Sequence, residues 1–178
     1  ALEICVRMWR DDRAEFAGKH YRVERAWNRP QPVQKPYPPI VIGGGGEKVL
    51  LKLVAQYAQV WNMGGSPAEF KHKMEILDRH CADVGRDPKE IERSWFGPLL
   101  IDDDADRLKR RLDKRAAAMG GVGAAMDERM IAGTPEQVIE RIREFTAIGV
   151  THFIAMFGRV DDLRATRLFA EKVIPAFR

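Results

Sequence analysis

The chain has 178 residues, enough to bury the core of one domain, and its 45% apolar and 31% charged residues are typical of a folded globular protein. Lysine and arginine outnumber aspartate and glutamate by 30 to 26, but the charges are interspersed and form no basic run with aromatic residues. We therefore expect neither nucleic acid nor, without an apolar run of spanning length, a membrane as a partner. Two cysteines are too few for a disulfide framework, and a reducing cytoplasm is the expected compartment.

The first ten residues carry apolar side chains at helical spacing, and no initiator methionine or capping residue precedes them. We expect the chain to begin inside a helix and to be a piece of a longer protein. Aromatic and β-branched runs on either side of Gly18 predict a small hairpin, and a series of prolines then predicts an extended connector. The expected segments are a helix end over residues 1–12, the hairpin and connector over 13–38, and strand-and-helix units over 39–178.

Four consecutive glycines, Gly43 to Gly46, connect a short buried strand at residues 40–42 to a helix. Glycines in such a turn let the backbone approach a ligand closely, and the first N–H groups of the helix favour a phosphate or another anion. The turn matches neither the Walker pattern nor the dinucleotide fingerprint, because Lys48 or Val49 stands where each requires a glycine. On these residues alone, an anion-binding turn and a plain connection are equally open.

Further strand-and-helix pairs follow this turn. Residues 59–63 predict a strand that ends at a second glycine pair, and Ser-Pro-Ala-Glu at 66–69 is a capping box that opens a helix ending at Gly85. Thr-Pro-Glu-Gln at 134–137 is a second capping box, which opens a later helix. A strand over 95–101 contains Pro98, for which we expect a bulge or an earlier strand start, since proline removes a ladder donor. The helix over 102–119 begins with three aspartates, which we interpret as a solvated helix start because consecutive side chains point in different directions.

The last predicted unit is a strand at residues 151–157, an apolar run of the kind that a parallel strand buried on both faces requires, followed by a helix over 161–177. We assign His152 to the core because it stands at the N-terminal end of the strand, away from the edge where such folds place their chemistry. His72 and His80 have no companion three or four residues away, which favours solvated or capping roles over a metal site.

Strand and helix thus alternate four times, which implies parallel strands joined by right-handed crossovers. An eight-fold α/β barrel takes about 250 residues, so a chain of this length with four units fits half of one. The sequence therefore predicts an α/β half-barrel.

Several segments also resemble a known family. The residues 30–47, which include Pro-Pro-Ile-Val-Ile-Gly-Gly, and the segments 16–21, 80–91 and 133–138 are similar to the luciferase-like monooxygenase superfamily, in particular to its coenzyme F420-dependent oxidoreductase branch. The resemblance covers nearly the whole chain but only the C-terminal half of such a protein, with strands five to eight of a TIM (β/α)8 barrel. It implies a single luciferase-like domain over residues 1–178 that is incomplete at its N-terminus.

The resemblance implies a flavin-type oxidoreductase that moves a hydride between C5 of coenzyme F420 and a small-molecule substrate. In relatives the glycine turn after strand five contacts the cofactor phosphate, which implies Gly44, Gly45 and Gly46 as cofactor-binding residues. In relatives the turn after strand six lies near the cofactor phosphate or the substrate, and the resemblance implies this position for Met63 and Gly64. Relatives take their acid and base groups from strands one to four, so no catalytic residue is assigned, no metal is expected, and this chain alone is expected to be inactive.

Two alternatives stay open. The same fold with FMN would be a luciferase-like monooxygenase. A non-catalytic half-barrel could instead pair with a second copy of itself and bury sheet edges that otherwise invite aggregation. The partners expected are therefore the substrate and the missing N-terminal half of the barrel, with a homodimer in the second alternative.

Overall fold

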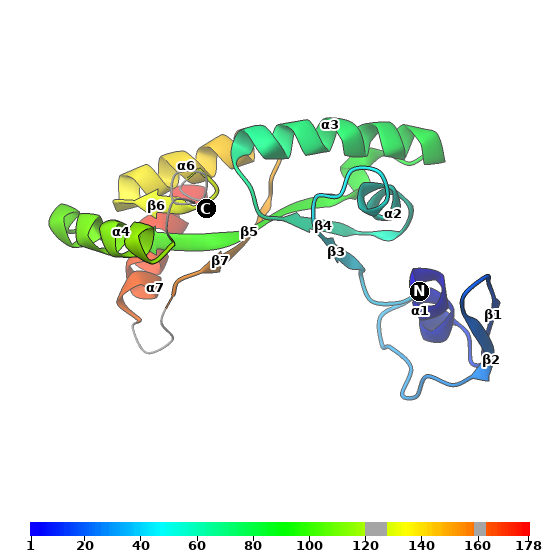
Figure 1. Ribbon diagram of the computed structural model, residues 1–178. Helices are drawn as coiled ribbons and strands as arrows, with labels where there is room; N and C mark the ends of the chain where they lie inside the picture. The colour runs from blue at the N-terminus through cyan, green and yellow to red at the C-terminus, as the bar shows by residue number, and fades with distance from the viewer. Residues whose placement is uncertain (120–127, 159–162) are drawn as a thin grey trace.

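The computed structural model describes residues 1–119, 128–158 and 163–178, and its elements are labelled in Figure 1. The first two residues of the helix predicted over 161–177 lie outside this range. In chain order the elements are α1 (Leu2–Arg10), β1 (Ala14–Ala17), β2 (Arg22–Ala26), β3 (Val41–Gly43), α2 (Leu50–Tyr57), β4 (Val60–Met63), α3 (Pro67–Val84), η1 (Pro88–Glu90), β5 (Glu92–Ile101), α4 (Ala105–Met119), β6 (Ile131–Gly133), α6 (Pro135–Ala147), β7 (His152–Met156), α7 (Arg164–Leu168), η3 (Phe169–Val173) and η4 (Ile174–Phe177).

The main sheet is parallel throughout. β3 pairs with β4, β4 with β5, and β5 with β7, while the short strand β6 pairs with the end of β5. This order confirms the parallel α/β sheet predicted from the alternation of strands and helices. β5 begins at Glu92, so the earlier strand start is confirmed, and Pro98 lies opposite Met156 of β7. β6 has three residues, too few for a sequence pattern to predict it.

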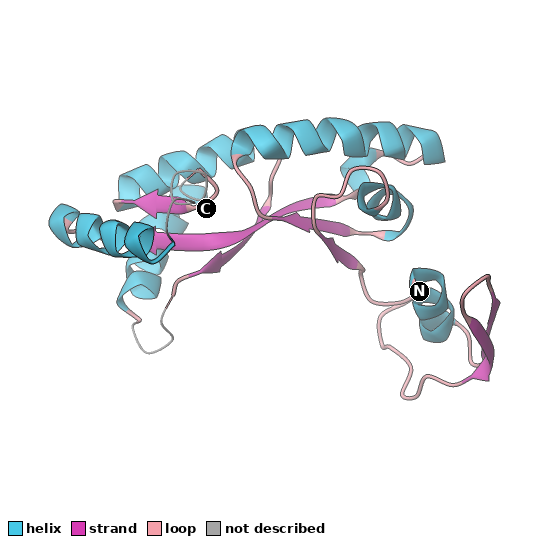
Figure 2. Ribbon diagram, viewed as in Figure 1, coloured by secondary structure: helices cyan, strands magenta, loops and turns pink. Residues whose placement is uncertain are grey.

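One face of the sheet packs against helices. Trp61, Met63 and Trp95 point to this face and are buried, and α2, α3 and α6 run along it in Figures 1 and 2. Phe145 of α6 packs against Trp95 and against Phe70 of α3, with ring centroids 5.8 and 5.7 Å apart. Each such fully buried side chain contributes about 1.5 to 3 kcal/mol of hydrophobic stabilisation, so this face forms the core.

The opposite face of the sheet is open within the described residues. Val41, Phe96, Ile154 and Met156 lie on it by register and expose 59, 40, 41 and 44% of their surface. The expectation that the last strand is buried on both faces is therefore wrong: β7 alternates between exposed and half-buried residues. The assignment of His152 to the core is also wrong, because it shares the open face with Ile154 and is exposed.

Two capping boxes fix the starts of long helices, as the sequence predicts. The Ser66 hydroxyl accepts a hydrogen bond from the N–H of Glu69 at 3.3 Å, and the Glu69 carboxylate accepts one from the N–H of Ser66 at 2.8 Å. α3 then ends at Gly85, whose φ of 68° is the left-handed conformation that favours glycine. These local signals fix where α3 begins and where it ends.

The predicted hairpin is present as the antiparallel pair β1 and β2, which lies beside α1 and apart from the main sheet in Figure 1. Gln31 ties the connector to α1, since its Nε2 donates to the carbonyls of Met8 and Asp11 at 3.1 and 3.2 Å. In the described part of the chain, no helix combines the length and the apolar character needed to cross a bilayer.

Candidate functional site

Two glycine turns meet at the edge where the parallel strands β3 and β4 end. The N–H of Gly44 donates to the carbonyl of Asn62 at 2.8 Å, and the indole Nε1 of Trp61 donates to the carbonyl of Gly44 at 2.8 Å. The structure thus joins the turn after β3 to the end of β4. The carboxyl ends of parallel strands are the edge at which α/β folds bind ligands.

The glycines of the first turn have different physical reasons to be glycine. Gly44 has a φ of 121°, a conformation that other residues rarely adopt. A Cβ at Gly45 would lie 2.9 Å from the Sδ of Met63, closer than packing allows. A Cβ at Gly46 would lie 3.4 Å from the Cβ of Leu50, which is close to an ordinary contact. Backbone conformation requires glycine at Gly44 and packing favours it at Gly45, whereas neither explains Gly46.

The backbone donors that follow Gly44 are available to a ligand. Within the described residues, the N–H groups of Gly45, Gly46, Glu47 and Lys48 make no hydrogen bond, and the next backbone bond is from Leu51 to the carbonyl of Gly46 at 2.9 Å. α2 has no side-chain cap and no acidic residue in its first turn. A row of free donors at the positive end of a helix fits an anionic group such as a phosphate.

The turn after β4 packs against the first turn through the side chain of Met63. Met63 is only 7% exposed and packs under Gly45 on the helix-covered face of the sheet. A Cβ at Gly64 would lie 2.8 Å from the carbonyl oxygen of Phe96, so glycine lets this turn pass close to β5. The structure therefore brings the five predicted cofactor residues together, with the Met63 side chain buried beneath the turn.

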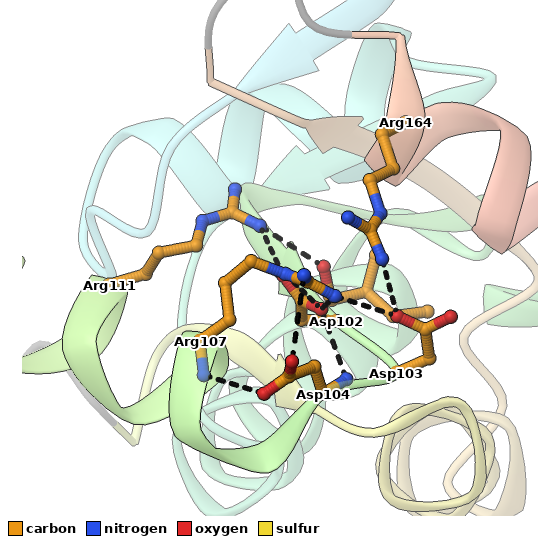
Figure 3. Close-up of polar contacts among 7 residues, drawn as sticks. Asp102, Asp103, Asp104, Arg107, Arg111 and Arg164 are labelled. Atoms are coloured by element: carbon orange, nitrogen blue, oxygen red, sulfur yellow. Dashed lines mark hydrogen bonds and ion pairs between the residues drawn. The ribbon is translucent and has the colours of Figure 1, made fainter.

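A second polar cluster lies at the carboxyl end of β5 (Figure 3). Asp102 is 3% exposed and accepts hydrogen bonds from Arg107 Nε at 2.8 Å and from Arg107 Nη2 at 2.7 Å. This guanidinium holds the pKa of the Asp102 carboxyl well below its usual range. The expectation of a solvated helix start is thus wrong for Asp102, which directly follows the last residue of a buried strand.

The remaining contacts of this cluster connect neighbouring helices. Arg111 Nη1 lies 3.4 Å from Asp102, and Asp103 accepts hydrogen bonds from Arg107 at 3.0 Å and from Arg164 of α7 at 2.8 Å. Each of these carboxylates has a guanidinium partner inside the protein. We therefore interpret the cluster as a structural connection of β5, α4 and α7. Across the described residues, no group of three or more His, Cys, Asp or Glu side chains is arranged to hold a metal ion.

A parallel sheet with helices on one face and glycine turns at its carboxyl edge defines an α/β protein with a ligand site at the strand ends. Comparison with known families makes this class specific: the model of the luciferase-like monooxygenase family matches residues 1–152. The chain belongs to this family, whose members are oxidoreductases and monooxygenases.

Solved structures share the fold. An F420-dependent secondary alcohol dehydrogenase, in complex with an F420–acetone adduct, superimposes with a TM-score of 0.82 at 20% identity over 99% of this chain and 60% of that one. The coenzyme F420-dependent tetrahydromethanopterin reductase of Methanopyrus kandleri superimposes with a TM-score of 0.77 at 21% identity, over 99% of this chain and 61% of that one. The oxygenating constituent of a diketocamphane monooxygenase from Pseudomonas putida, in complex with FMN, superimposes with a TM-score of 0.69 at 16% identity. This match covers 98% of this chain and 61% of that one. The chain spans about three fifths of the length of these proteins.

Proposed function

We propose that this chain is the cofactor-phosphate-binding part of an F420-dependent oxidoreductase. When bound, the deazaflavin supplies a hydride donor or acceptor at C5, opposite an unidentified small organic substrate. The observation that carries the proposal is the row of N–H groups from Gly45 to Lys48, which make no hydrogen bond to the described part of the chain and fit the phosphate of such a cofactor. Family membership and the two F420-dependent structures of the same fold support it.

Under this proposal each residue of the site has a physical role. The N–H groups of Gly45 and Gly46 donate charge-assisted hydrogen bonds to phosphate oxygens. Gly44 turns the backbone toward the strand edge, Met63 supports Gly45 from below, and Gly64 holds the second turn close to β5. No residue of this chain is assigned an acid or base role.

We further propose that β3, β4, β5 and β7 are strands five to eight of a (β/α)8 barrel whose first four strands come from an N-terminal part outside this chain. The open apolar face, with Phe96 and Ile154, then becomes the barrel interior. This arrangement is supported by the length match, since the chain covers about three fifths of the related chains. In it, residues 1–178 are one incomplete luciferase-like domain, inactive without its N-terminal half.

FMN is the alternative cofactor and would make the protein a luciferase-like monooxygenase. The FMN-bound structure of the same fold supports this candidate, and the phosphate site would be the same. A fluorescence titration of the full-length protein with each cofactor separates the two. We expect F420 to bind at least about tenfold more tightly, a difference of about 1.4 kcal/mol. Preference for FMN would favour the monooxygenase, and binding of neither would reject both.

One observation favours a non-catalytic alternative, in which two copies associate. β3 and β7 each have a single strand partner in the described chain, and the face between them is apolar. A two-fold axis along the strands would place β3 of one copy parallel to β7 of its partner. Sedimentation velocity of the 178-residue chain tests this: a dimer supports it, and a monomer without affinity for an apolar dye rejects it.

We propose a reducing cytoplasm as the compartment, because two cysteines are too few for a disulfide framework. Cys81 is fully buried in the core. Burial raises the pKa of the Cys81 thiol, so the thiol stays protonated and poorly reactive at neutral pH.

A further inference from the structure

Both ends of the first glycine turn are fixed, whereas its middle is free. At the start, Gly44 exchanges hydrogen bonds with the backbone of Asn62 and the indole of Trp61, both at 2.8 Å. At the end, Glu47 is held by side chains of α3. The N–H groups of Gly45 and Gly46 between these two anchors make no bond within the described residues.

Three α3 side chains contact Glu47. Lys73 Nζ donates to Oε1 of Glu47 at 2.5 Å, and His72 Nε2 lies 3.2 Å from the same oxygen. His80 Nε2 lies 2.8 Å from the backbone carbonyl of Glu47. Because a carbonyl oxygen can only accept, His80 carries its proton on Nε2 and donates it.

Lys73 and His80 are the shielded members of this group. Their side chains are 23% and 20% exposed, whereas the His72 side chain is 61% exposed. The Lys73 stem also runs beside the turn, since a Cβ at Gly45 would lie 3.7 Å from its Cε. Lys73, with His72, lowers the pKa of Glu47, whose carboxylate is ionised at neutral pH.

A run of glycines needs such anchors if it is to bind a ligand well. Glycine has the largest backbone freedom of any residue, and ordering it on binding costs affinity. Holding the turn in its bound conformation beforehand removes this cost. Held at Gly44 and at Glu47, the turn is a candidate for a preorganised site.

We propose that Lys73 and His80 are positioning residues for the phosphate site, which act by holding Glu47 and thereby ordering the N–H groups of Gly45 and Gly46. This inference rests on the proposed function of the turn. In this proposal both side chains act through the backbone of the turn. The expected effect is on affinity for the phosphate-bearing form of the ligand, because the N–H groups that they order are the proposed phosphate donors.

The test compares ligands that differ in the phosphate alone. FMN and riboflavin form such a pair, as do the monophosphate of the deazaflavin and the free deazaflavin, and their dissociation constants are measured on the full-length protein. His80→Leu removes the donor at similar bulk, while His80→Gln keeps an N–H donor. Lys73→Met removes the charge but keeps the stem beside Gly45. His20→Leu and Lys71→Met are matched controls at exposed positions.

We expect His80→Leu and Lys73→Met to raise the dissociation constant of the phosphate-bearing ligand by about five- to tenfold, because preorganisation of the turn is lost. The dissociation constant of the phosphate-free ligand should stay within about twofold of the parent value. We also expect faster hydrogen exchange of the amides from Gly45 to Lys48 in the free protein, and rescue of both properties by His80→Gln. The controls should match the parent protein.

The other outcomes each overturn a defined claim. If the parent protein prefers the phosphate-bearing ligand and both variants keep this preference in full, Lys73 and His80 are not positioning residues, and the proposed function stands. If the variants weaken the binding of both ligands equally, they act through general stability and the inference fails. If the parent protein shows no preference for phosphate, the phosphate site itself fails.

Discussion

Asp102 and Arg107 form a two-pronged ion pair at the end of β5, with Nη2 2.7 Å from Oδ1 and Nε 2.8 Å from Oδ2 (Figure 3). Asp102 precedes α4, and Arg107 lies in the first turn of that helix. The pair therefore fixes the direction in which α4 leaves the sheet. Because Asp102 is buried, its carboxylate has little water to replace a lost partner.

Asp102→Asn should lower the free energy of unfolding by about 2 kcal/mol, since hydrogen bonds to a charged group are lost and the facing guanidiniums lose their counter-charge. Urea denaturation of the 178-residue chain measures this. Asp103→Asn is the matched control, because Asp103 is about half exposed, and it should cost less than about 1 kcal/mol. Equal effects of the two variants would show that the buried pair has no special role.

Acid should weaken the fold through the same carboxylate. The pKa of Asp102 lies below its ordinary value of 3.8, so around that pH the folded state binds fewer protons than the unfolded state and stability rises with pH. The contribution is present above the ordinary value and is lost as the pH falls below it toward the folded pKa. Arg129 likewise lowers the pKa of Glu69, so Glu69 contributes to the stability in the same direction.

Urea titrations between about pH 6 and pH 3 measure this linkage. The parent protein should lose stability as the pH falls, and the difference between it and Asp102→Asn should narrow over the same range. A difference that is constant or grows on acidification would contradict a lowered pKa for Asp102.

The glycine turn allows binding and folding to be tested separately. Gly44→Ala should destabilise the protein by about 1 kcal/mol or more, because alanine is strained at a φ of 121°. Gly46→Ala should change stability by less than about 0.5 kcal/mol, because the added Cβ would meet Leu50 at 3.4 Å. It should still weaken binding of the phosphate-bearing cofactor, since it restricts the backbone of a residue whose N–H is a proposed phosphate donor. Thermal melts and cofactor titrations measure the two effects. An unchanged affinity in Gly46→Ala would mean that the turn is only a connection.

The proposed half-barrel predicts a different response in the 178-residue chain and in a full-length protein that includes the proposed N-terminal half. Phe96→Asp should change the stability of the 178-residue chain little, because Phe96 is 40% exposed there, and it should reduce binding of an apolar dye. In the full-length protein the same change should cost about 3 kcal/mol or more, since it buries an unpaired charge inside a closed barrel.

Val33→Asp is the matched control, because Val33 is 96% exposed in the connector, and it should be neutral in both proteins. A full-length protein that tolerates Phe96→Asp as well as Val33→Asp would contradict the half-barrel.

The sequence was sufficient for the features that local signals determine. Both capping boxes, the glycine turn after β3 and the stop of α3 at Gly85 depend on residues within a few positions of each other, so spacing alone predicts them. Their order along the chain then predicts the parallel sheet. The glycine turn was recognised as a candidate site for the same reason.

Features that depend on the packing of distant elements were not predictable. Three consecutive aspartates look alike in sequence, and only the orientation of α4 buries Asp102 against Arg107. The apolar run of β7 has no alternation, so the sequence did not reveal that His152 faces the open side. His80 meets Glu47 only because α3 packs against the start of α2, across 33 positions of the chain.

The central claim is that the turn from Gly44 to Gly46 holds the phosphate of a flavin-type cofactor. Its most direct test is the amide NMR spectrum of the full-length protein, labelled with 15N and titrated with coenzyme F420 and with FMN. We predict saturable shifts of the Gly45 and Gly46 amides with the cofactor that binds, and none with its phosphate-free form. A cofactor that binds tightly while these amide resonances stay unchanged would contradict the claim.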